Sequence, residues 1–450
     1  MGVNTALSTF APHSTWCKEV RNIVFLIDAD NFYFGAEAVF DASLREKAVV
    51  VLSGNDACVV ARSPLAKQLG VRMGAPIFEY RELIATHNII LRSSNYALYS
   101  SLSDRMVKAI ELFFPREKIE RYSIDEVFVN GSAIPDEELL VVGRKLRTTV
   151  QRLTGGLSVS IGIASTKILA KVSIEIAKAE PEYRGVHSLA LATEQEIDTL
   201  LAGLSVKDIW GIGTRTARKL EHYHGIISAK ALKYADPRWI RTHIHVVGQR
   251  IVLELNGRSC LPVQATEKPK KSILSSQTFG HAIVSLESVK QAVAYFMSKA
   301  AEKLRKQGSR AALVAVFLQT NRFAHDEPYY AQSASKLLPF PSAFTPDLIT
   351  VAQELVAIIY RSGYSFKRAG VYLARLSPQA VLQGDLFGDF SLEQQAKQER
   401  LMHMVDALNR YWGNNTLFYA SIGIERTWQM KQTHKSPSYT TRWQDILTIQ

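Results

Sequence analysis

Two adjacent acids, Asp125 and Glu126, interrupt the apolar run "RYSIDEVFVN" (residues 121–130), which otherwise has the composition of a buried strand. One interpretation places the two acids at a strand end, where water solvates them. The other is a divalent cation such as Mg²⁺, which prefers carboxylate oxygens and offsets the cost of holding like charges together. Because neighbouring side chains of a strand point to opposite faces, a shared ion also requires a local turn or bulge.

A second apolar run, "NIVFLIDADNFYFGAEAVF", also ends in acids, since Ile23 to Ile27 lead directly to Asp28 and Asp30. This second acidic site favours the cation. "KAVVVLSG", which stops at Gly54, predicts another buried strand, and "LSVSIGIASTKILAKVSIEIAKAE" predicts a strand followed by a helix from Thr166 to Ala179. The alternation of strands and helices predicts an α/β or α+β core.

The overall charge indicates a polyanionic partner. The chain has 54 Lys and Arg against 42 Asp and Glu, a net charge of +12 and a pI near 9.4. No uninterrupted apolar segment reaches the ~20 residues of a membrane helix, so nucleic acid is favoured over a membrane surface. A length of 450 residues predicts a multidomain chain, with about three or four domains of ~100–200 residues each.

The cysteines and the N-terminus carry little information about function. Cys17, Cys58 and Cys260 are scattered without CxxC spacing, which argues against both a disulfide framework and a zinc site and fits a reducing cytoplasm. Residues 1–20 lack the pattern of a signal peptide, and we expect them to form a short, loosely ordered extension.

The helix predicted over 166–179 carries a basic stripe. Lys167, Lys171 and Lys178 are spaced i, i+4 and i+11, which places them within about 40° of one another around the helix. Such a stripe is either the solvated face of an amphipathic helix or a binding site for phosphate. Its position directly after a core strand favours the second alternative.

A glycine hairpin begins another basic helix. In "VKDIWGIGTRTARKL" Gly211 and Gly213 flank Ile212, and Arg215, Arg218 and Lys219 follow. Backbone N–H groups at such a hairpin can hold a DNA phosphate without recognising base sequence. The alternative is a plain helix–turn–helix connection that packs against its neighbour.

The C-terminal half contains a linker, a basic domain and a tail. Residues 258–272 lack periodicity and contain Lys270 and Lys271 in a basic cluster, which predicts a linker. Between residues 264 and 375 there are 15 Lys or Arg and 7 Asp or Glu, so a compact α+β domain with a basic face is expected there. In the polar tail that follows, "QGDLF" contains a short apolar anchor of the kind that docks into a partner's groove; the alternative is a chance match, because such pentapeptides are common.

Taken in order, these motifs resemble the Y-family of translesion DNA polymerases and, within it, the UmuC branch, the catalytic subunit of bacterial DNA polymerase V. The resemblance covers residues 22 to 445. The runs that carry it are "DADNFYFGAE", "VVVLSGNDACVVARSPLAKQLGVRMG", "SSNYALYSSLSDR", "YSIDEVF", "GIASTKILAKV", "VKDIWGIGTRTARKL", "DEPYYAQSASKLL" and "QMKQTHKSPSYTTR".

The resemblance implies a role for the acids. Asp28, Asp125 and Glu126 match the catalytic carboxylates that hold two Mg²⁺ ions, and the backbone carbonyl of Ala29 matches a further ligand of the nucleotide-bound ion. Asp30 matches a position where an acid is not always present, and a structural role is the alternative for it.

The resemblance also implies contacts with the incoming nucleotide. Tyr33 matches the steric gate, the ring that excludes a ribose 2′-hydroxyl; the alternative is a core aromatic beside Phe32. Arg62 and Lys67 match residues that contact the base and triphosphate, and Lys178 matches a palm lysine that contacts the triphosphate. Pro64 stands where other family members have a triphosphate-binding tyrosine, so that contact is not expected.

For architecture, the resemblance implies a right-hand polymerase, α+β and multidomain. The expected parts are an N-terminal extension (1–20), a palm (21–31 and 96–185), small fingers (32–95), a helical thumb with a helix-hairpin-helix (186–257), a linker (258–271), an α+β little finger (272–375) and a UmuC-type tail (376–450).

The implied activity is error-prone nucleotide addition opposite damaged template in the SOS DNA-damage response. Primer-template DNA and dNTPs are the implied substrates, and the implied partners are a UmuD-type dimer, RecA and the sliding clamp. Gln383, Leu386 and Phe387 of "QGDLF" would contact the clamp, although Gly384 departs from the usual apolar second residue. Two rival hypotheses are a nucleotidyl cyclase or metal nuclease with the same acids, and a DNA-binding factor that has lost its chemistry.

Overall fold

The computed structural model describes residues 21–266, 268–324, 326–379 and 392–447. The N-terminal extension (1–20) and the residues expected to bind the clamp, Gln383, Leu386 and Phe387, lie outside these ranges. The chain divides into two compact units: one comprises residues 1–42, 96–266 and 439–450, and the other comprises 43–95 and 267–438. None of the helices in the described ranges has the length and apolar character needed to cross a membrane.

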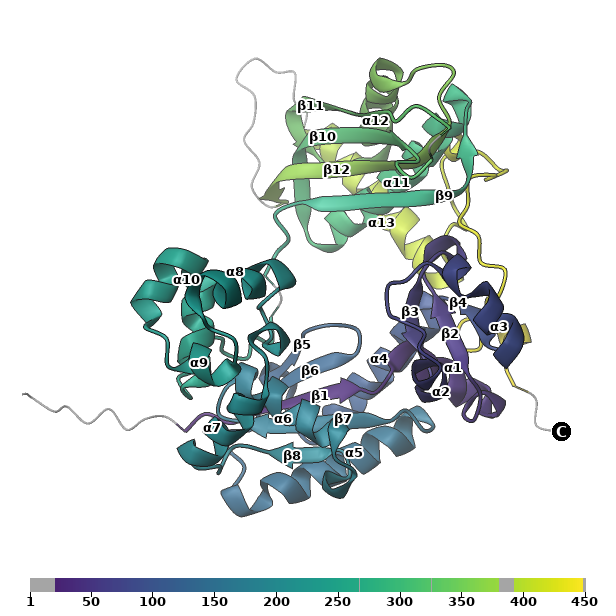
Figure 1. The fold of residues 1–450 in the computed structure, drawn as a ribbon. Coiled ribbons are helices and arrows are strands. Elements are labelled where there is room, and N and C mark those ends of the chain that lie inside the picture. The colour runs from purple at the N-terminus through teal and green to yellow at the C-terminus, as the bar shows by residue number, and fades with distance from the viewer. Residues whose placement is uncertain (1–20, 267, 325, 380–391, 448–450) are drawn as a thin grey trace, which may run out of the picture. The chain divides into compact units, whose positions relative to one another are not determined.

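The first unit is built on a sheet with strand order β5-β6-β1-β7-β8 (Figure 1). Its central strand has the sequence VFLIDA, and all but one of its side chains are buried, so both faces of the sheet must be covered. The strands are β1 (Val24–Ala29), β5 (Ile119–Arg121), β6 (Glu126–Asn130), β7 (Val159–Ala164) and β8 (Val186–Ser188).

The helices of this unit include α6, which begins at the cap residue Thr166, as the sequence predicts. It packs so closely on β7 that a Cβ at Gly162 would lie 2.3 Å from the carbonyl oxygen of Ala170, so only glycine fits there. The other helices around the sheet are α1 (Phe32–Phe40), α4 (Tyr96–Ile110) and α5 (Leu139–Thr154), and α6 itself spans Lys167–Ala179.

A helical part follows β8 and contains the glycine hairpin. Gly211 has φ 92°, a conformation that favours glycine, and Gly213 caps α8. Ile212 and Leu220 are buried in one core. The helices are α7 (Glu194–Gly203), α8 (Thr214–His224), α9 (Ala229–Lys233) and α10 (Pro237–Leu255).

The second unit contains a small sheet of order β3-β2-β4 with its own apolar core. Its central strand pairs antiparallel with β3 and parallel with β4, so β4 is an edge strand of this sheet. The elements are β2 (Val49–Leu52), β3 (Val59–Arg62), α2 (Pro64–Gln68), α3 (Arg81–His87) and β4 (Ile90–Ser93). We refer to residues 43–95 as the fingers.

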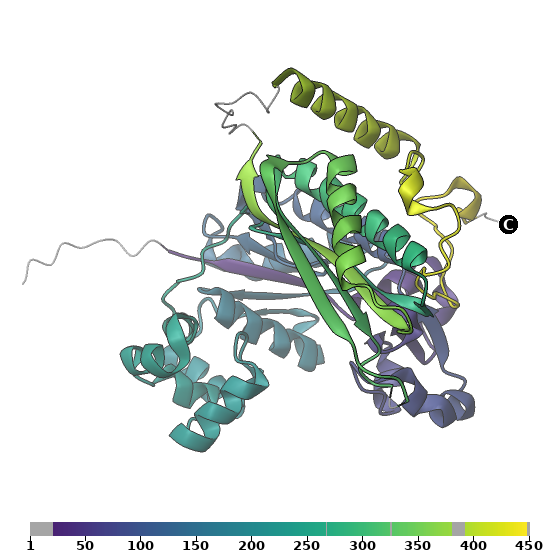
Figure 2. The ribbon, with the colours of Figure 1, turned by 90° about the horizontal axis from the view of Figure 1, so that it is seen from above.

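A larger sheet of order β11-β10-β12-β9 forms the rest of this unit. Alternate residues of its long strands, such as Val314, Val316 and Leu318, are buried in a core shared with α11 and α12, which cover one face (Figure 2). The elements are β9 (Ile273–Ile283), α11 (Leu286–Lys306), β10 (Ser309–Thr320), β11 (Ala331–Ser342), α12 (Thr345–Ile359), β12 (Phe366–Pro378) and α13 (Leu392–Trp412). We call residues 268–378 the little finger, which includes Lys270 and Lys271 from the end of the expected linker.

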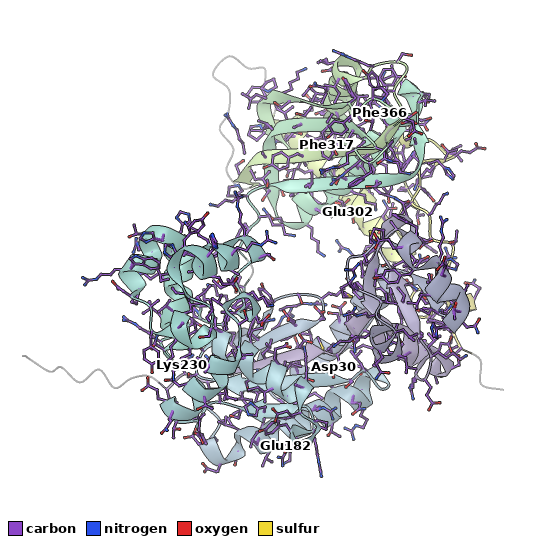
Figure 3. All side chains as sticks on the ribbon, viewed as in Figure 1. Asp30, Glu182, Lys230, Glu302, Phe317 and Phe366 are labelled. Carbon is purple, nitrogen blue, oxygen red and sulfur yellow. The ribbon has the colours of Figure 1, made fainter. Side chains whose placement is uncertain are left out.

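The two faces of the little-finger sheet differ in character. Phe366 is fully buried in the core, whereas Phe317 is half-buried and lies against the guanidinium group of Arg368, 5.6 Å from its ring centre; both phenylalanines are labelled in Figure 3. Arg305 in α11 binds Asp406 in α13 through two hydrogen bonds of 2.7 Å, which holds the C-terminal helix to the domain.

The strands and helix predicted from the apolar patterns, β1, β2, β7 and α6, are present, and the C-terminal half contains strands and helices, as expected for an α+β domain. The mixture of sheets and helices confirms the predicted α+β, multidomain fold class. The helix α1 lies in the first unit, whereas the sequence interpretation included residues 32–42 in the fingers.

Candidate active site

Two acids meet at the ends of paired strands in the first unit. Asp28 of β1 and Glu126 of β6 are direct cross-strand partners, which places their side chains next to each other on one face of the sheet. Only 13% of the Asp28 side chain and 17% of the Glu126 side chain are exposed. The strand pairing therefore holds two carboxylates together in a place that water reaches poorly.

The third acid, Asp125, lies in the turn before β6. The amides of Tyr122 and Ser123 both donate to the carbonyl of Glu126, which closes this turn. The side chain of Asp125 accepts a hydrogen bond from the Ser123 hydroxyl, 2.5 Å away, and its carbonyl accepts one from the amide of Ala29. The turn ends the regular alternation of side chains before β6, so Asp125 is not fixed on the strand face opposite to Glu126.

The basic stripe on α6 faces these acids and the neighbouring strand. The ammonium group of Lys178 lies 3.0 Å from Asp28, and Lys171 forms an ion pair with Glu126. Lys167 is 5% exposed and lies 2.6 Å from Glu120. The interpretation of the stripe as a solvated helix face is therefore wrong for Lys167 and Lys171, whose side chains lie largely buried against carboxylates. Lys178 is exposed, and its ammonium group is directed to Asp28.

The pKa of Asp28 reflects this environment. Burial raises the pKa to about 7 from an ordinary 3.8, although the ammonium group of Lys178 acts to lower it. The neighbouring carboxyl of Glu126 raises it further. A divalent cation would have the opposite effect, since it stabilises the ionised carboxylate.

Asp30 has a different role from Asp28, although only one residue separates them. Its two carboxylate oxygens accept hydrogen bonds from the hydroxyls of Ser158 and Ser160, at 2.7 and 2.8 Å. These serines lie before and on β7, so Asp30, labelled in Figure 3, joins two parts of the sheet. This arrangement favours the structural alternative for Asp30.

Tyr33 stands in a group of aromatic rings beside the acids. Its ring stacks on that of Tyr99, with centres 4.4 Å apart and planes 15° from parallel, and meets Tyr96 edge-on. Phe32 is buried, whereas Tyr33 is half-buried. Burial, then the neighbouring Tyr96 and Asp125, raise the pKa of Tyr33.

A buried acid supports the ring on which Tyr33 stacks. The hydroxyl of Tyr99 donates to the carboxylate of Glu37, 2.8 Å away, and Glu37 is 1% exposed. Sequence reasoning did not identify Glu37 or Tyr99. One available indication was a single acid within the apolar run "FYFGAEAVF", since a buried acid requires a partner.

The expected nucleotide contacts Arg62 and Lys67 lie in the fingers, within the second unit. Arg62 ends β3, and its guanidinium group donates to the carbonyl of Val71. Lys67 is exposed in the last turn of α2, a helix that Pro64 begins in a position suited to proline.

The residues expected to contact DNA are solvent-accessible. Arg215, Arg218 and Lys219 are exposed on α8 after the hairpin. Lys270 and Lys271 are exposed at the start of the little finger, where the Gln307 side chain bonds both the amide and the carbonyl of Lys270 at 2.9 Å. The backbone of Lys270 is thus held at a defined place beside the end of α11, and Lys271 follows it directly.

Metal binding depends on the three acids closing together. Within the described ranges no three side chains of His, Cys, Asp or Glu already converge as a metal site. Asp28 and Glu126 are nevertheless cross-strand neighbours, and Asp125 lies in the turn directly before Glu126. Carboxylates together with a backbone carbonyl form the hard oxygen set that Mg²⁺ prefers. The donor set fits the ion, provided that Lys171 and Lys178 are displaced as it binds.

Solved structures identify the fold. A chimera of the Y-family DNA polymerases Dbh and Dpo4 matches with a TM-score of 0.62 and 21% identity, covering 79% of this chain and 99% of that one. A ternary complex of Dbh DNA polymerase matches with a TM-score of 0.53 and 20% identity, over 79% of this chain and 99% of that one. The fold is that of a Y-family DNA polymerase.

Sequence relatives define the family. The pattern of the impB/mucB/samB family matches residues 27–175, and that of its C-terminal domain matches 270–386. Protein SamB of Salmonella typhimurium is 39% identical over 94% of this chain and 98% of its own length. Protein UmuC of the same organism is 38% identical over 94% of this chain and 99% of its own. The chain belongs to the impB/mucB/samB family, the UmuC branch of the Y-family polymerases, and is a DNA-directed DNA polymerase.

A more distant relative and a further domain complete the comparison. DNA polymerase IV of Oceanobacillus iheyensis is 25% identical over 88% of this chain and 91% of its own length. Residues 399–449 match a domain of unknown function.

Proposed function

We propose that this polymerase extends primers across damaged template and that Asp28, Asp125 and Glu126 hold two Mg²⁺ ions for the reaction. The observation that carries the proposal is the pairing of Asp28 with Glu126 at the ends of β1 and β6, beside the turn that presents Asp125. When bound, the ions would stabilise charge on the phosphate and lower the pKa of the primer 3′-hydroxyl.

The chain's own groups account for the other requirements of nucleotide addition. Lys178, now paired with Asp28, is free to contact the triphosphate once a metal ion takes the carboxylate. The ring of Tyr33, supported by Tyr99, would lie against the incoming sugar and exclude a 2′-hydroxyl. Arg62 and Lys67 would contact the base and triphosphate from the fingers.

The test is primer extension by the purified full-length chain with Mg²⁺ and dNTPs, on an undamaged template and on one with a single abasic site. We expect extension past the abasic site that disappears when Mg²⁺ is chelated. Extension only on the undamaged template would contradict the proposed synthesis across damaged DNA. It would not contradict the assignment of the chain as a DNA-directed DNA polymerase.

A sliding clamp, a UmuD-type dimer and RecA are the partners that we propose from the resemblance, together with a role in the SOS response. The clamp contact would involve Gln383, Leu386 and Phe387. Because two small apolar anchors bury little area, we expect that contact to be weak, roughly micromolar.

DNA binding should depend on the basic start of the little finger. We expect the double variant Lys270→Glu, Lys271→Glu to weaken DNA binding on all sequences. It should also reduce the slope of log K against log salt by about 0.9 for each DNA phosphate that the protein no longer neutralises. Titration of labelled primer-template at several salt concentrations measures both effects.

A matched control separates this contact from overall charge. Arg144→Glu with Lys145→Glu makes the same change in charge at two exposed neighbours on α5. We expect the control to leave the slope nearly unchanged. An equal change in both double variants would mean that net charge, rather than the two lysines, governs the salt dependence.

A further inference from the structure

The domain of unknown function, residues 399–449, contains a segment that contacts both the little finger and the fingers. This segment, residues 428–438, is called the strap below. Figure 1 shows it in yellow, running from beside β9 to β4. It lies wholly within the second unit and within the domain of unknown function.

The strap begins in the core of the little finger. Trp428 is 1% exposed, and its ring lies 5.3 Å from that of Tyr295 and 5.6 Å from that of Phe296. A Cβ at Gly280 in β9 would lie only 2.4 Å from the carbonyl oxygen of Gln429, so the strap passes this strand where only glycine leaves room. One end of the strap is thus part of the domain core.

The strap then meets the turn after β2. The amide of Lys431 donates to the side-chain oxygen of Asn55 at 2.9 Å, and the amide and hydroxyl of Thr433 both donate to one carboxylate oxygen of Asp56, at 2.8 and 2.9 Å. Asn55 and Asp56 both have positive φ, 62° and 52°, a conformation that is uncommon outside glycine. These hydrogen bonds help to hold the turn in that conformation.

Further along, the strap pairs with the open edge of the fingers sheet. The amide of Ser93 donates to the carbonyl of His434, and the amide of His434 donates to the hydroxyl of Ser93, both at 3.0 Å. Ser93 and Lys435 form a parallel β-bridge. At Ser93, the last residue of β4, the strap therefore pairs with the open edge in the way an added strand would.

The strap ends on a buried amide of the fingers. Asn95 is fully buried, and its side-chain nitrogen donates to the hydroxyl of Ser436 at 3.0 Å and to the carbonyl of Pro437 at 3.2 Å. The fingers also contact the little finger directly, because the amide nitrogen of Asn55 donates to the carbonyl of Thr278 in β9 at 2.9 Å. Asn55 thus bonds both the strap and β9.

We propose that the domain of unknown function (residues 399–449) serves to bind the fingers to the little finger, with the strap as the connecting element. In sequence the fingers are inserted between α1 and α4 of the first unit, yet they form one compact unit with the little finger. The strap gives a physical reason for this grouping, because Trp428 anchors it in the core of the little finger and Lys435 pairs with Ser93 in the sheet of the fingers. The fingers consequently move with the domain that carries Lys270 and Lys271.

The test is hydrogen–deuterium exchange on the full-length chain carrying Thr433→Pro. Proline removes both donors to Asp56, and we expect exchange in residues 90–95 and 430–437 to become about 10-fold faster, with α11 unchanged. The matched control is Thr416→Pro, which removes an amide and a hydroxyl that both bond Gly413 elsewhere in the same domain. The control should leave residues 90–95 unchanged.

Unchanged protection of residues 90–95 in Thr433→Pro would overturn the proposal, as would an equal loss in the control. If α11 also loses protection, the substitution has disturbed the whole little finger. The proposal is then tested by hydrogen–deuterium exchange on Thr433→Val. This variant removes only the hydroxyl donor, and we expect about 3-fold faster exchange in residues 90–95 alone. No change in that variant would overturn the proposal.

A kinetic readout connects the strap to nucleotide addition, and this part rests on the proposed function. If the fingers carry nucleotide contacts, Thr433→Pro should raise the KM for dNTP about 5-fold or more and change kcat less, because positioning of the nucleotide suffers before chemistry. Faster exchange with an unchanged KM would support the strap while contradicting the role assigned to Arg62 and Lys67.

Discussion

Asp28→Asn is expected to reduce the rate of nucleotide addition by more than about 100-fold, because loss of partners that only orient metal ligands already costs 10–100-fold. The substitution preserves the size of the side chain and its place at the end of β1. Binding of primer-template should remain nearly intact, since this carboxylate is assigned to metal and not to DNA. Single-turnover extension measures the rate, and fluorescence anisotropy measures DNA binding. Asp125→Ala and Glu126→Ala should behave in the same way.

Asp30→Asn is the matched control, because Asp30 follows two residues later and its oxygens bond Ser158 and Ser160. We expect this variant to lose less than about 10-fold in rate and to lose some thermal stability instead, since one or two hydrogen bonds to a charged group weaken. Equal losses of rate in Asp28→Asn and Asp30→Asn would contradict the assignment of distinct roles. A rate near wild type for Asp28→Asn would refute the metal assignment.

Tyr33→Ala is expected to lower discrimination against ribonucleotides by more than about 10-fold, the ratio that corresponds to 1.4 kcal/mol. The reason is steric: the ring, held by its stack on Tyr99, would otherwise meet a 2′-hydroxyl. The measurement is the ratio of kcat/KM for dNTP and rNTP on one template. A gate that acts by a clash should affect rNTP use more than dNTP use.

Tyr33→Phe provides the control, since it keeps the ring and removes only the hydroxyl. We expect it to preserve discrimination. Unchanged selectivity in Tyr33→Ala would assign Tyr33 to the core beside Phe32, whereas loss of selectivity in both variants would point to the hydroxyl rather than the ring.

Much of the secondary structure was predictable because it depends on local patterns. The apolar run before Asp28 and the 3.6-residue spacing after Thr166 correspond to β1 and α6. A turn before Glu126 was expected only if the two adjacent acids share an ion, since neighbours on a regular strand face opposite sides, and the structure has such a turn. These conclusions require only a few neighbouring residues.

The site was predictable only in part, because the direction of a side chain depends on its neighbours in space. The lysine spacing indicated one stripe but not its direction, which packing of α6 on β7 decides by turning Lys171 toward Glu126. Asp28 and Asp30 have similar sequence surroundings, yet α6 supplies a lysine to Asp28, whereas serines before and on β7 bond Asp30. Glu37 and Tyr99 become partners only when α1 and α4 meet.

The sequence by itself determined the order of strands, helices and acids, and its resemblance to polymerases of one branch indicated the family. Only the tertiary structure decided which carboxylates pair with lysines and which element joins the fingers to the little finger. The physical reason is distance along the chain. Asn95 and Ser436 are separated by 341 positions, and no local periodicity encodes a hydrogen bond between them. Such a bond exists because the strap, which Trp428 anchors in the little-finger core, brings the Ser436 hydroxyl to the buried side-chain amide of Asn95.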